Sequence, residues 1–130
     1  MIQDTSFIID ILHNQTDALQ YLKHIEKENR PEKIASITVL ELYEAVPQLD
    51  LPEERQQKIL DVLDTRHAVD ADETVMRKAG KLSGELTARG QEIDREDCII
   101  GATALLHDEP VVTRNNDHFN RIDGLEVETY

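Results

Sequence analysis

Cysteine is almost absent from this sequence of 130 residues, which contains only Cys98. A single cysteine cannot form an internal disulfide, and it cannot supply the paired thiolates of a structural zinc site. The five histidines are scattered, and no two of them stand four residues apart as zinc ligands on one helix often do. We therefore expect no zinc site, and the lack of a disulfide framework fits a protein of the reducing cytoplasm.

Long apolar runs are also missing. No stretch approaches the roughly 20 apolar residues of a membrane-spanning helix, so we expect no membrane association. The residues from Met1 to Asp4 are not a basic segment followed by a long apolar core, so they do not resemble a signal peptide. The glycine patterns of phosphate-binding loops do not occur. Without linkers or repeats, residues 1–130 are expected to form a single domain.

Positive charge is scarce, since 14 Lys and Arg stand against 27 Asp and Glu and give a net charge of -13. One interpretation is a protein that avoids polyanions such as nucleic acids. The other is a protein from a salt-loaded cytoplasm, such as that of a halophilic archaeon, where molar salt screens charges within about 3 Å. The acids are spread along the chain instead of forming a tail, which favours the second interpretation. The net charge therefore does not exclude a nucleic-acid substrate.

Short apolar strands alternate with helices along the chain. Strands are expected at residues 2–4, 34–37, 67–70, 110–113 and 125–129, and helices at 5–12, 16–27, 39–46, 52–63, 72–89 and 94–104. Such alternation predicts an α/β fold, with a parallel sheet covered by helices on both faces. Gly90 suits the end of the longest helix. Gly80 and Gly84 inside that helix cost about 1 kcal/mol each relative to Ala, which indicates close packing there.

Three acids stand at comparable places around this sheet. Asp4 ends the first strand, Glu41 lies one turn into the helix after the second strand, and Asp97 lies one turn into the helix before the fourth. Asn115 and Asp117 follow the fourth strand. In a doubly wound sheet these positions meet at the carboxyl ends of the strands, where ligands bind.

Carboxylates that converge in one pocket repel each other unless a cation binds. Mg²⁺ and Mn²⁺ are hard ions that prefer oxygen ligands, and either can activate a water for phosphoryl displacement. The alternative is that the acids only cap helices. Thr38 and Glu41 match a capping box, and Asp97 would occupy the third position of a helix capped by Asp94. The protein would then be a non-catalytic acidic binding domain, and spacing alone leaves both alternatives open.

Four segments of the chain resemble the PIN domain family, in particular VapC-type toxins. The segments follow one another in family order and at family spacing across almost the whole chain: Ile2–Ser6, Ser36–Leu42, Asp97–Ala104, and Val112–Phe119 with Ile122–Leu125. The resemblance implies a PIN-like three-layer α/β/α fold with a central parallel sheet of four to five strands. It also implies a metal-dependent endoribonuclease, a homodimer, and a small antitoxin that blocks the active site.

The resemblance also assigns roles to residues. It makes Asp4, Glu41 and Asp97 an acidic triad, with Asp4 and Asp97 the first candidates for direct ligands of Mg²⁺ or Mn²⁺. The fourth position of the family is often Asp, but this sequence has Asn115 there and Asp117 two residues later. Which of the two completes the site stays open, as does the binding of a second metal ion. An RNA-processing nuclease without an antitoxin is the alternative within this fold.

Partner binding can be predicted in outline. Arg114, Arg121 and Arg95 stand near the expected site and either pair with RNA phosphates or offset neighbouring acids. The apolar faces of residues 16–27 and 52–63 either receive an amphipathic antitoxin helix, or pack on the sheet or in a dimer interface. An arginine of the antitoxin could enter the pocket of acids as a planar donor fork.

Overall fold

Five parallel strands form one sheet in the computed structural model, which describes all 130 residues. The strands are β1 (Ile2–Gln3), β2 (Lys33–Ala35), β3 (His67–Val69), β4 (Val111–Val112) and β5 (Val127–Glu128). Their order across the sheet is β3-β2-β1-β4-β5, and every neighbouring pair is parallel. The prediction of an α/β fold with a parallel sheet is confirmed.

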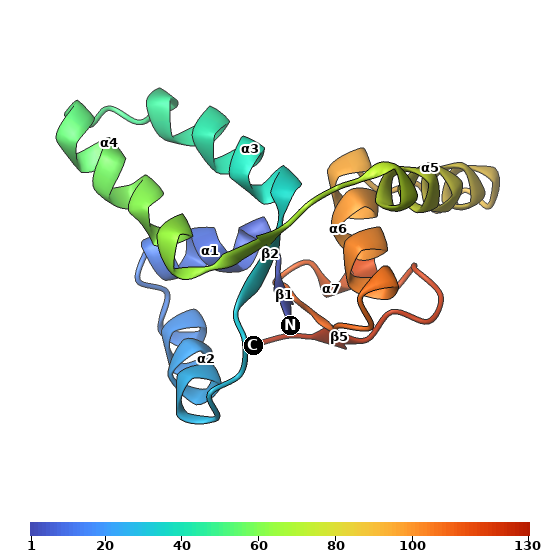
Figure 1. Ribbon diagram of the computed structural model, residues 1–130, viewed down its shortest axis with the longest axis horizontal. Helices are drawn as coiled ribbons and strands as arrows, with labels where there is room; N and C mark the ends of the chain where they lie inside the picture. The colour runs from blue at the N-terminus through green and yellow to red at the C-terminus, as the bar shows by residue number, and fades with distance from the viewer.

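Helices cover both faces of the sheet (Figure 1). They are α1 (Thr5–Leu12), α2 (Thr16–Lys27), α3 (Ser36–Ala45), α4 (Glu53–Leu60), α5 (Glu73–Ala88), α6 (Arg95–Leu106) and the short α7 (Asn116–Phe119). Figure 1 shows α1 to α4 on one side of the strands and α5 and α6 on the other. Two 3-10 turns, η1 (Val46–Gln48) and η2 (Asp61–Thr65), flank α4. None of these helices combines the length and the apolar character that crossing a membrane requires.

The strands supply apolar side chains to both faces alternately. Ile2 and Val111 belong to the core beneath α5 and α6, whereas Val112 packs with Phe7 of α1 on the other face. A third cluster lies between α1, α3 and α4 and contains Ile8, Ile34, Leu42, Val46 and Leu60. Each such side chain contributes about 1.5–3 kcal/mol when fully buried. Because the central strands are buried on both faces, their carboxyl ends are held in fixed positions.

The longest helix begins and ends as the sequence predicts. The side chain of Asp72 accepts a hydrogen bond from the Val75 amide at 3.0 Å, and Gly90 follows the helix with a φ of +69°. The predicted close packing at Gly80 and Gly84 is wrong, because a Cβ added at either position would meet nothing within 4 Å. These two glycines instead leave part of the α5 surface open.

The start of α3 differs from the prediction. The helix begins at Ser36, with Ala35 as its N-cap, so Thr38 lies inside the helix and the predicted capping box of Thr38 and Glu41 is wrong. The reason is a tertiary contact, since the Ser36 hydroxyl accepts a hydrogen bond from the Ala71 amide at 3.0 Å. That bond ties the first turn of α3 to the chain that leaves β3. Glu41 is thereby placed in the second turn of α3.

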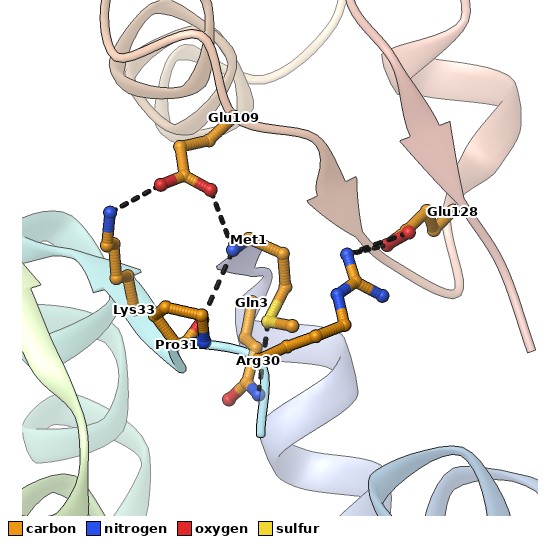
Figure 2. A network of polar contacts seen from close by, with 7 residues as sticks. All are labelled: Met1, Gln3, Arg30, Pro31, Lys33, Glu109 and Glu128. Carbon is orange, nitrogen blue, oxygen red and sulfur yellow. Dashed lines mark hydrogen bonds and ion pairs between the residues drawn. The ribbon is translucent and has the colours of Figure 1, made fainter. Parts of the chain in front are cut away.

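Ion pairs join segments that are distant in the sequence, as Figure 2 shows. The amino group of Met1 lies 2.7 Å from a carboxylate oxygen of Glu109, and Lys33 pairs with the other oxygen. Arg30 donates to both carboxylate oxygens of Glu128 at 2.9 Å. The contacts of Met1, Lys33 and Glu109 gather at the amino ends of β1, β2 and β4. The candidate site lies at the opposite edge of the sheet.

Candidate active site at the carboxyl ends of the central strands

The chain reverses its direction of travel across the sheet between β1 and β4. From β1 it moves to β2 on one side, and it later returns to form β4 on the other side. The carboxyl ends of β1 and β4 therefore flank the switch point, where open α/β sheets bind their ligands. Asp4 directly follows β1 and Thr113 directly follows β4, and the Asp4 amide donates to the Val112 carbonyl at 2.9 Å.

Asp4 is 3% exposed and has one carboxylate oxygen held firmly. The hydroxyls of Ser6 and Thr113 each donate to Oδ2 at 2.7 Å. No protein group donates to Oδ1, and the side chain makes no capping hydrogen bond although Asp4 stands at the N-cap of α1. The arrangement leaves Oδ1 available to a ligand at the switch point.

Glu41 reaches the same edge from α3. Its Oε1 accepts a hydrogen bond of 2.8 Å from the Thr5 hydroxyl, which also lies 3.0 Å from the Thr38 hydroxyl. The pKa of Glu41 is raised to about 7, mainly by burial and in part by the charges of Asp4 and Asp97, against the opposing effect of the Thr5 bond. These charge interactions indicate that the three acids lie near one another.

Asp97 arrives from the first turn of α6, three residues after its N-cap Asp94, as predicted. Its Oδ2 lies 3.3 Å from Nδ1 of His118, and its side chain is 14% exposed. The pKa of Asp97 is raised to about 6, mainly by burial and in part by the charge of Asp4, while the contact with His118 acts in the opposite direction. The capping residue Asp94 makes no side-chain hydrogen bond to the helix.

The structure does not join Asn115 and Asp117 to this cluster through their side chains. The backbone amide of Asn115 donates to the Thr113 hydroxyl at 2.9 Å, but the Asn115 side chain is exposed at the N-cap of α7. Asp117 is exposed in the first turn of α7 and has no hydrogen-bond partner. The acids brought together are thus Asp4, Glu41 and Asp97.

Four polar side chains of the site were not identified from the sequence. They are the hydroxyls of Thr5, Ser6 and Thr113, which hold the acids, and the imidazole of His118, which contacts Asp97. The His118 side chain is 43% exposed and nevertheless contacts Asp97. The signal for the hydroxyls was present, because Thr and Ser directly follow Asp4 and Thr113 directly follows β4.

The donor set suits a hard divalent ion. As the side chains lie, no group of three His, Cys, Asp or Glu residues is gathered tightly enough to hold a metal by itself. Mg²⁺ does not need such a cage, because it retains several waters and binds one or two carboxylates. Oδ1 of Asp4 has no protein donor, and mutual repulsion adds to the burial that raises the pKa values of Glu41 and Asp97, so a cation among these acids would be stabilised. Cys98 is buried and its thiol has a raised pKa, so it does not resemble a ligand.

Comparison with known proteins gives consistent sequence matches. Residues 1–125 match the PIN domain family. "Ribonuclease VapC1" of Methanocaldococcus jannaschii is 27% identical over 131 residues, which cover 100% of this chain and 86% of that protein. "Ribonuclease VapC2" of Rickettsia felis is 25% identical and covers 98% of this chain and 95% of its own length.

Solved structures also resemble this chain over nearly its full length. VapBC2 from Rickettsia felis, bound to a DNA fragment from its promoter, has a TM-score of 0.86 and 26% identity, covering 99% of this chain and 97% of that chain. DNA-bound VapBC from Salmonella typhimurium has a TM-score of 0.85 and 24% identity, and the match covers 98% of this chain and 96% of that chain. The second likeness concerns the fold alone.

Proposed function

Because this chain belongs to the PIN domain family, we propose that it is a metal-dependent endoribonuclease acting in the cytoplasm as the toxin of a VapBC-type pair. The observation that carries this proposal is the cluster of Asp4, Glu41 and Asp97 at the switch point of the sheet. Full-length similarity to proteins named ribonuclease VapC supports the assignment of RNA as substrate. RNA cleavage at a phosphodiester bond is the reaction that such a cluster suits.

Each acid has a distinct part in the proposed reaction. Asp4 and Asp97 would hold Mg²⁺, or Mn²⁺ in its place, and Glu41 would complete the metal-binding triad. When bound, the metal supplies an activated water and offsets the negative charge that develops at phosphorus. The hydroxyls of Ser6 and Thr113 hold Oδ2 of Asp4, which keeps its Oδ1 directed to the ligand.

Glu41 would take part through Oε2, because the Thr5 hydroxyl donates to Oε1 and no protein group donates to Oε2. Its pKa of about 7 is that of the metal-free protein, and a cation bound beside it would lower that pKa. Asn115 is proposed as a fourth site residue and Asp117 as its alternative. Asn115→Ala is expected to reduce activity less than Asp97→Asn. Only the backbone amide of Asn115 contacts Thr113, and the substitution keeps that amide.

A cognate antitoxin is the proposed protein partner, as the structures of VapBC relatives suggest. A groove of about 530 Å³ between α1, α3 and α4 suits an amphipathic helix, and eight of its eleven lining residues are hydrophobic, among them Leu12, Leu42 and Ile59. The apolar face of α2 is not part of this groove, because its Ala18 and Ile25 pack into the core. Of the two apolar helix faces predicted to receive the antitoxin, only that of residues 52–63 contributes to the groove.

A second copy of the chain is proposed as a further partner. Met76 on α5 is 49% exposed, and beside it Gly80 and Gly84 present open backbone. These residues border a shallow depression of about 400 Å³ that also includes Arg95 and Ile99. A helix of a second copy can approach closely where glycines replace larger side chains, which supports a homodimer through α5.

The toxin role is tested by expression in a host that lacks the antitoxin. The chain alone is expected to arrest growth, whereas Asp97→Asn is expected to leave growth normal at the same protein level. Co-expression of a small reading frame adjacent to the gene is expected to relieve the arrest. Normal growth with abundant, cleavage-competent protein would reject the toxin role and favour an RNA-processing nuclease.

A further inference from the structure

A fourth buried acid lies outside the proposed catalytic set. Asp10 is 3% exposed on α1, six residues or about 9 Å along the helix from Asp4. Both of its carboxylate oxygens are occupied. The guanidinium of Arg114 donates to Oδ1, and the hydroxyl of Tyr130 donates to Oδ2 at 2.6 Å. The three side chains come from α1, the chain after β4 and the chain after β5, so this contact joins segments that are distant in sequence.

The backbone of Arg114 is part of the site itself. Its amide donates to the Ser6 hydroxyl at 3.2 Å, and Ser6 in turn donates to Oδ2 of Asp4 at 2.7 Å. The preceding residue, Thr113, donates to the same oxygen at 2.7 Å. The segment 113–115 is therefore tied to α1 twice, through Ser6 near Asp4 and through Asp10 further along the helix.

Tyr130 is fixed by packing as well as by its hydrogen bond. Its ring lies 5.0 Å from that of Phe7 and 6.1 Å from that of Tyr21, measured between centroids. Burial raises the pKa of Tyr130, and the hydrogen bond to Asp10 raises it further, so the hydroxyl stays protonated as a donor. Asp10 thus keeps two permanent donors.

We infer that Asp10, Arg114 and Tyr130 form a clamp that positions Asp4 for metal binding by holding residues 113–115 against α1. The inference rests on the proposed function, because it assigns positioning residues to that same site. A buried carboxylate that loses its arginine partner is left poorly compensated, and the segment that carries the arginine is then free to move. Changing a residue that orients a metal ligand typically costs roughly 10- to 100-fold in metal affinity or activity.

The Arg114 side chain is 53% exposed, so a direct contact with an RNA phosphate is the competing role. The two roles predict different measurements. A clamp acts on Asp4 and changes the affinity for metal in the absence of RNA. A phosphate contact changes the affinity for RNA and leaves the binding of metal to the free protein unaltered.

The test compares Asp10→Asn, Arg114→Gln, Arg114→Lys and Tyr130→Phe with Arg89→Gln. Arg89→Gln is the control, because it removes an ion pair of 3.3 Å with Asp123 in which neither residue contacts Asp4, Glu41 or Asp97. Calorimetry gives the dissociation constant of Mn²⁺ for the RNA-free protein, and cleavage of a short RNA gives kcat and KM. Circular dichroism and thermal melting show which variants fold, and the nearly isosteric Tyr130→Phe keeps the test valid if Asp10→Asn does not fold.

Asp10→Asn and Arg114→Gln are expected to weaken Mn²⁺ binding and to lower kcat by about 10-fold each, with little change in KM. Tyr130→Phe and Arg114→Lys are expected to have smaller effects in the same direction, and the control none. Combining Asp10→Asn with Arg114→Gln is expected to be no worse than either change alone.

Unchanged Mn²⁺ affinity in the folded variants would overturn the clamp. A raised KM for Arg114→Gln alone, with normal Mn²⁺ binding, would do so as well and would assign Arg114 to RNA. A native protein that binds Mn²⁺ but cleaves no RNA would contradict the proposed function instead. In that case the Mn²⁺ measurements would still decide whether the clamp positions Asp4.

Discussion

Each acid at the sheet edge is held by a side chain and not by a helix amide. Asp4 accepts from two hydroxyls, Glu41 accepts from Thr5, and Asp97 contacts His118. The interpretation of these acids as helix caps therefore has no hydrogen bond to support it.

The sequence could place the three acids at one edge, because strand ends and helix starts are local features. It could not identify Asp10 as part of the same region, because its partner Tyr130 is 120 residues away.

Asp97→Asn separates a ligand role from a structural role. The change removes the negative charge and nearly preserves the shape, so we expect RNA cleavage to fall by at least about 100-fold. The metal-free variant is expected to be no less stable than the native chain, because the raised pKa of Asp97 indicates that its charge is unfavourable in the folded protein. Asp94→Asn in the same turn is the matched control and is expected to retain nearly full activity. Equal losses in the two variants would argue against Asp97 as a ligand.

Metal binding is expected to be coupled to proton release. The pKa values of about 7 for Glu41 and about 6 for Asp97 lie above the ordinary values of 4.5 and 3.8. In the metal-free protein these acids therefore hold protons between about pH 4 and pH 7 that the unfolded chain does not hold. Their contribution to stability is greatest below that window and is lost as the pH rises through it.

Mn²⁺ must displace those protons, so its affinity is expected to rise between pH 5.5 and pH 8. Calorimetry in two buffers of different ionisation enthalpy is expected to detect one to two protons released at about pH 6 and almost none at pH 8.5. The charges nearest these two acids, Asp4, Glu96 and His118, enter the same balance. Affinity that does not change with pH would contradict the proposed ligand set.

At the scale of the helices, local signals correctly predicted the limits of α5 and the start of α6. Asp72, Gly90 and Asp94 mark the limits of α5 and the start of α6 as expected. The start of α3 was misplaced because the bond between Ser36 and the Ala71 amide links two segments that no local pattern relates. Tertiary contacts thus decided the one helix start that proved wrong.

Gly84→Ala tests whether the exposed surface of α5 is open in the monomer. With nothing within 4 Å of the added Cβ, the change is expected to raise the free energy of unfolding by about 1 kcal/mol. Urea unfolding at a concentration where the protein is monomeric provides the measurement. In the comparison variant Gly101→Ala, the added Cβ would lie 2.5 Å from Cδ1 of Ile122, so its stability is expected to be unchanged or lower. A destabilised Gly84→Ala would show that α5 is packed against something at that position.

At the scale of the whole molecule, the alternation of strands and helices was sufficient to predict a parallel sheet. The order of the strands places Asp4 and Thr113 side by side on β1 and β4, with Glu41 and Asp97 on flanking helices. The family resemblance supplied what patterning cannot, namely the expectation of an RNA substrate and of an antitoxin partner. The net charge did not decide the substrate, because the 27 acids are spread along the chain and also fit a surface adapted to salt.

The net charge of -13 is expected to make stability depend on salt. Repulsion among surface acids is long-ranged at low ionic strength and is screened within about 3 Å at 1 M salt. The melting temperature is therefore expected to rise by on the order of 5 °C between 0.1 and 2 M KCl. Differential scanning calorimetry measures the change, and sucrose at matched osmolality controls for solvent effects. A flat or falling melting temperature would reject an adaptation of the surface to salt.

Cleavage of RNA by the purified protein, with and without chelator, tests the central claim most directly. A short labelled RNA is incubated with the native chain in Mg²⁺, in excess EDTA, and in EDTA followed by an excess of Mn²⁺. We predict cleavage with Mg²⁺, none in EDTA, recovery with Mn²⁺, and almost none for Asp97→Asn under every condition. Cleavage that persists in excess EDTA, or at native rates in Asp97→Asn, would contradict metal-dependent catalysis by Asp4, Glu41 and Asp97.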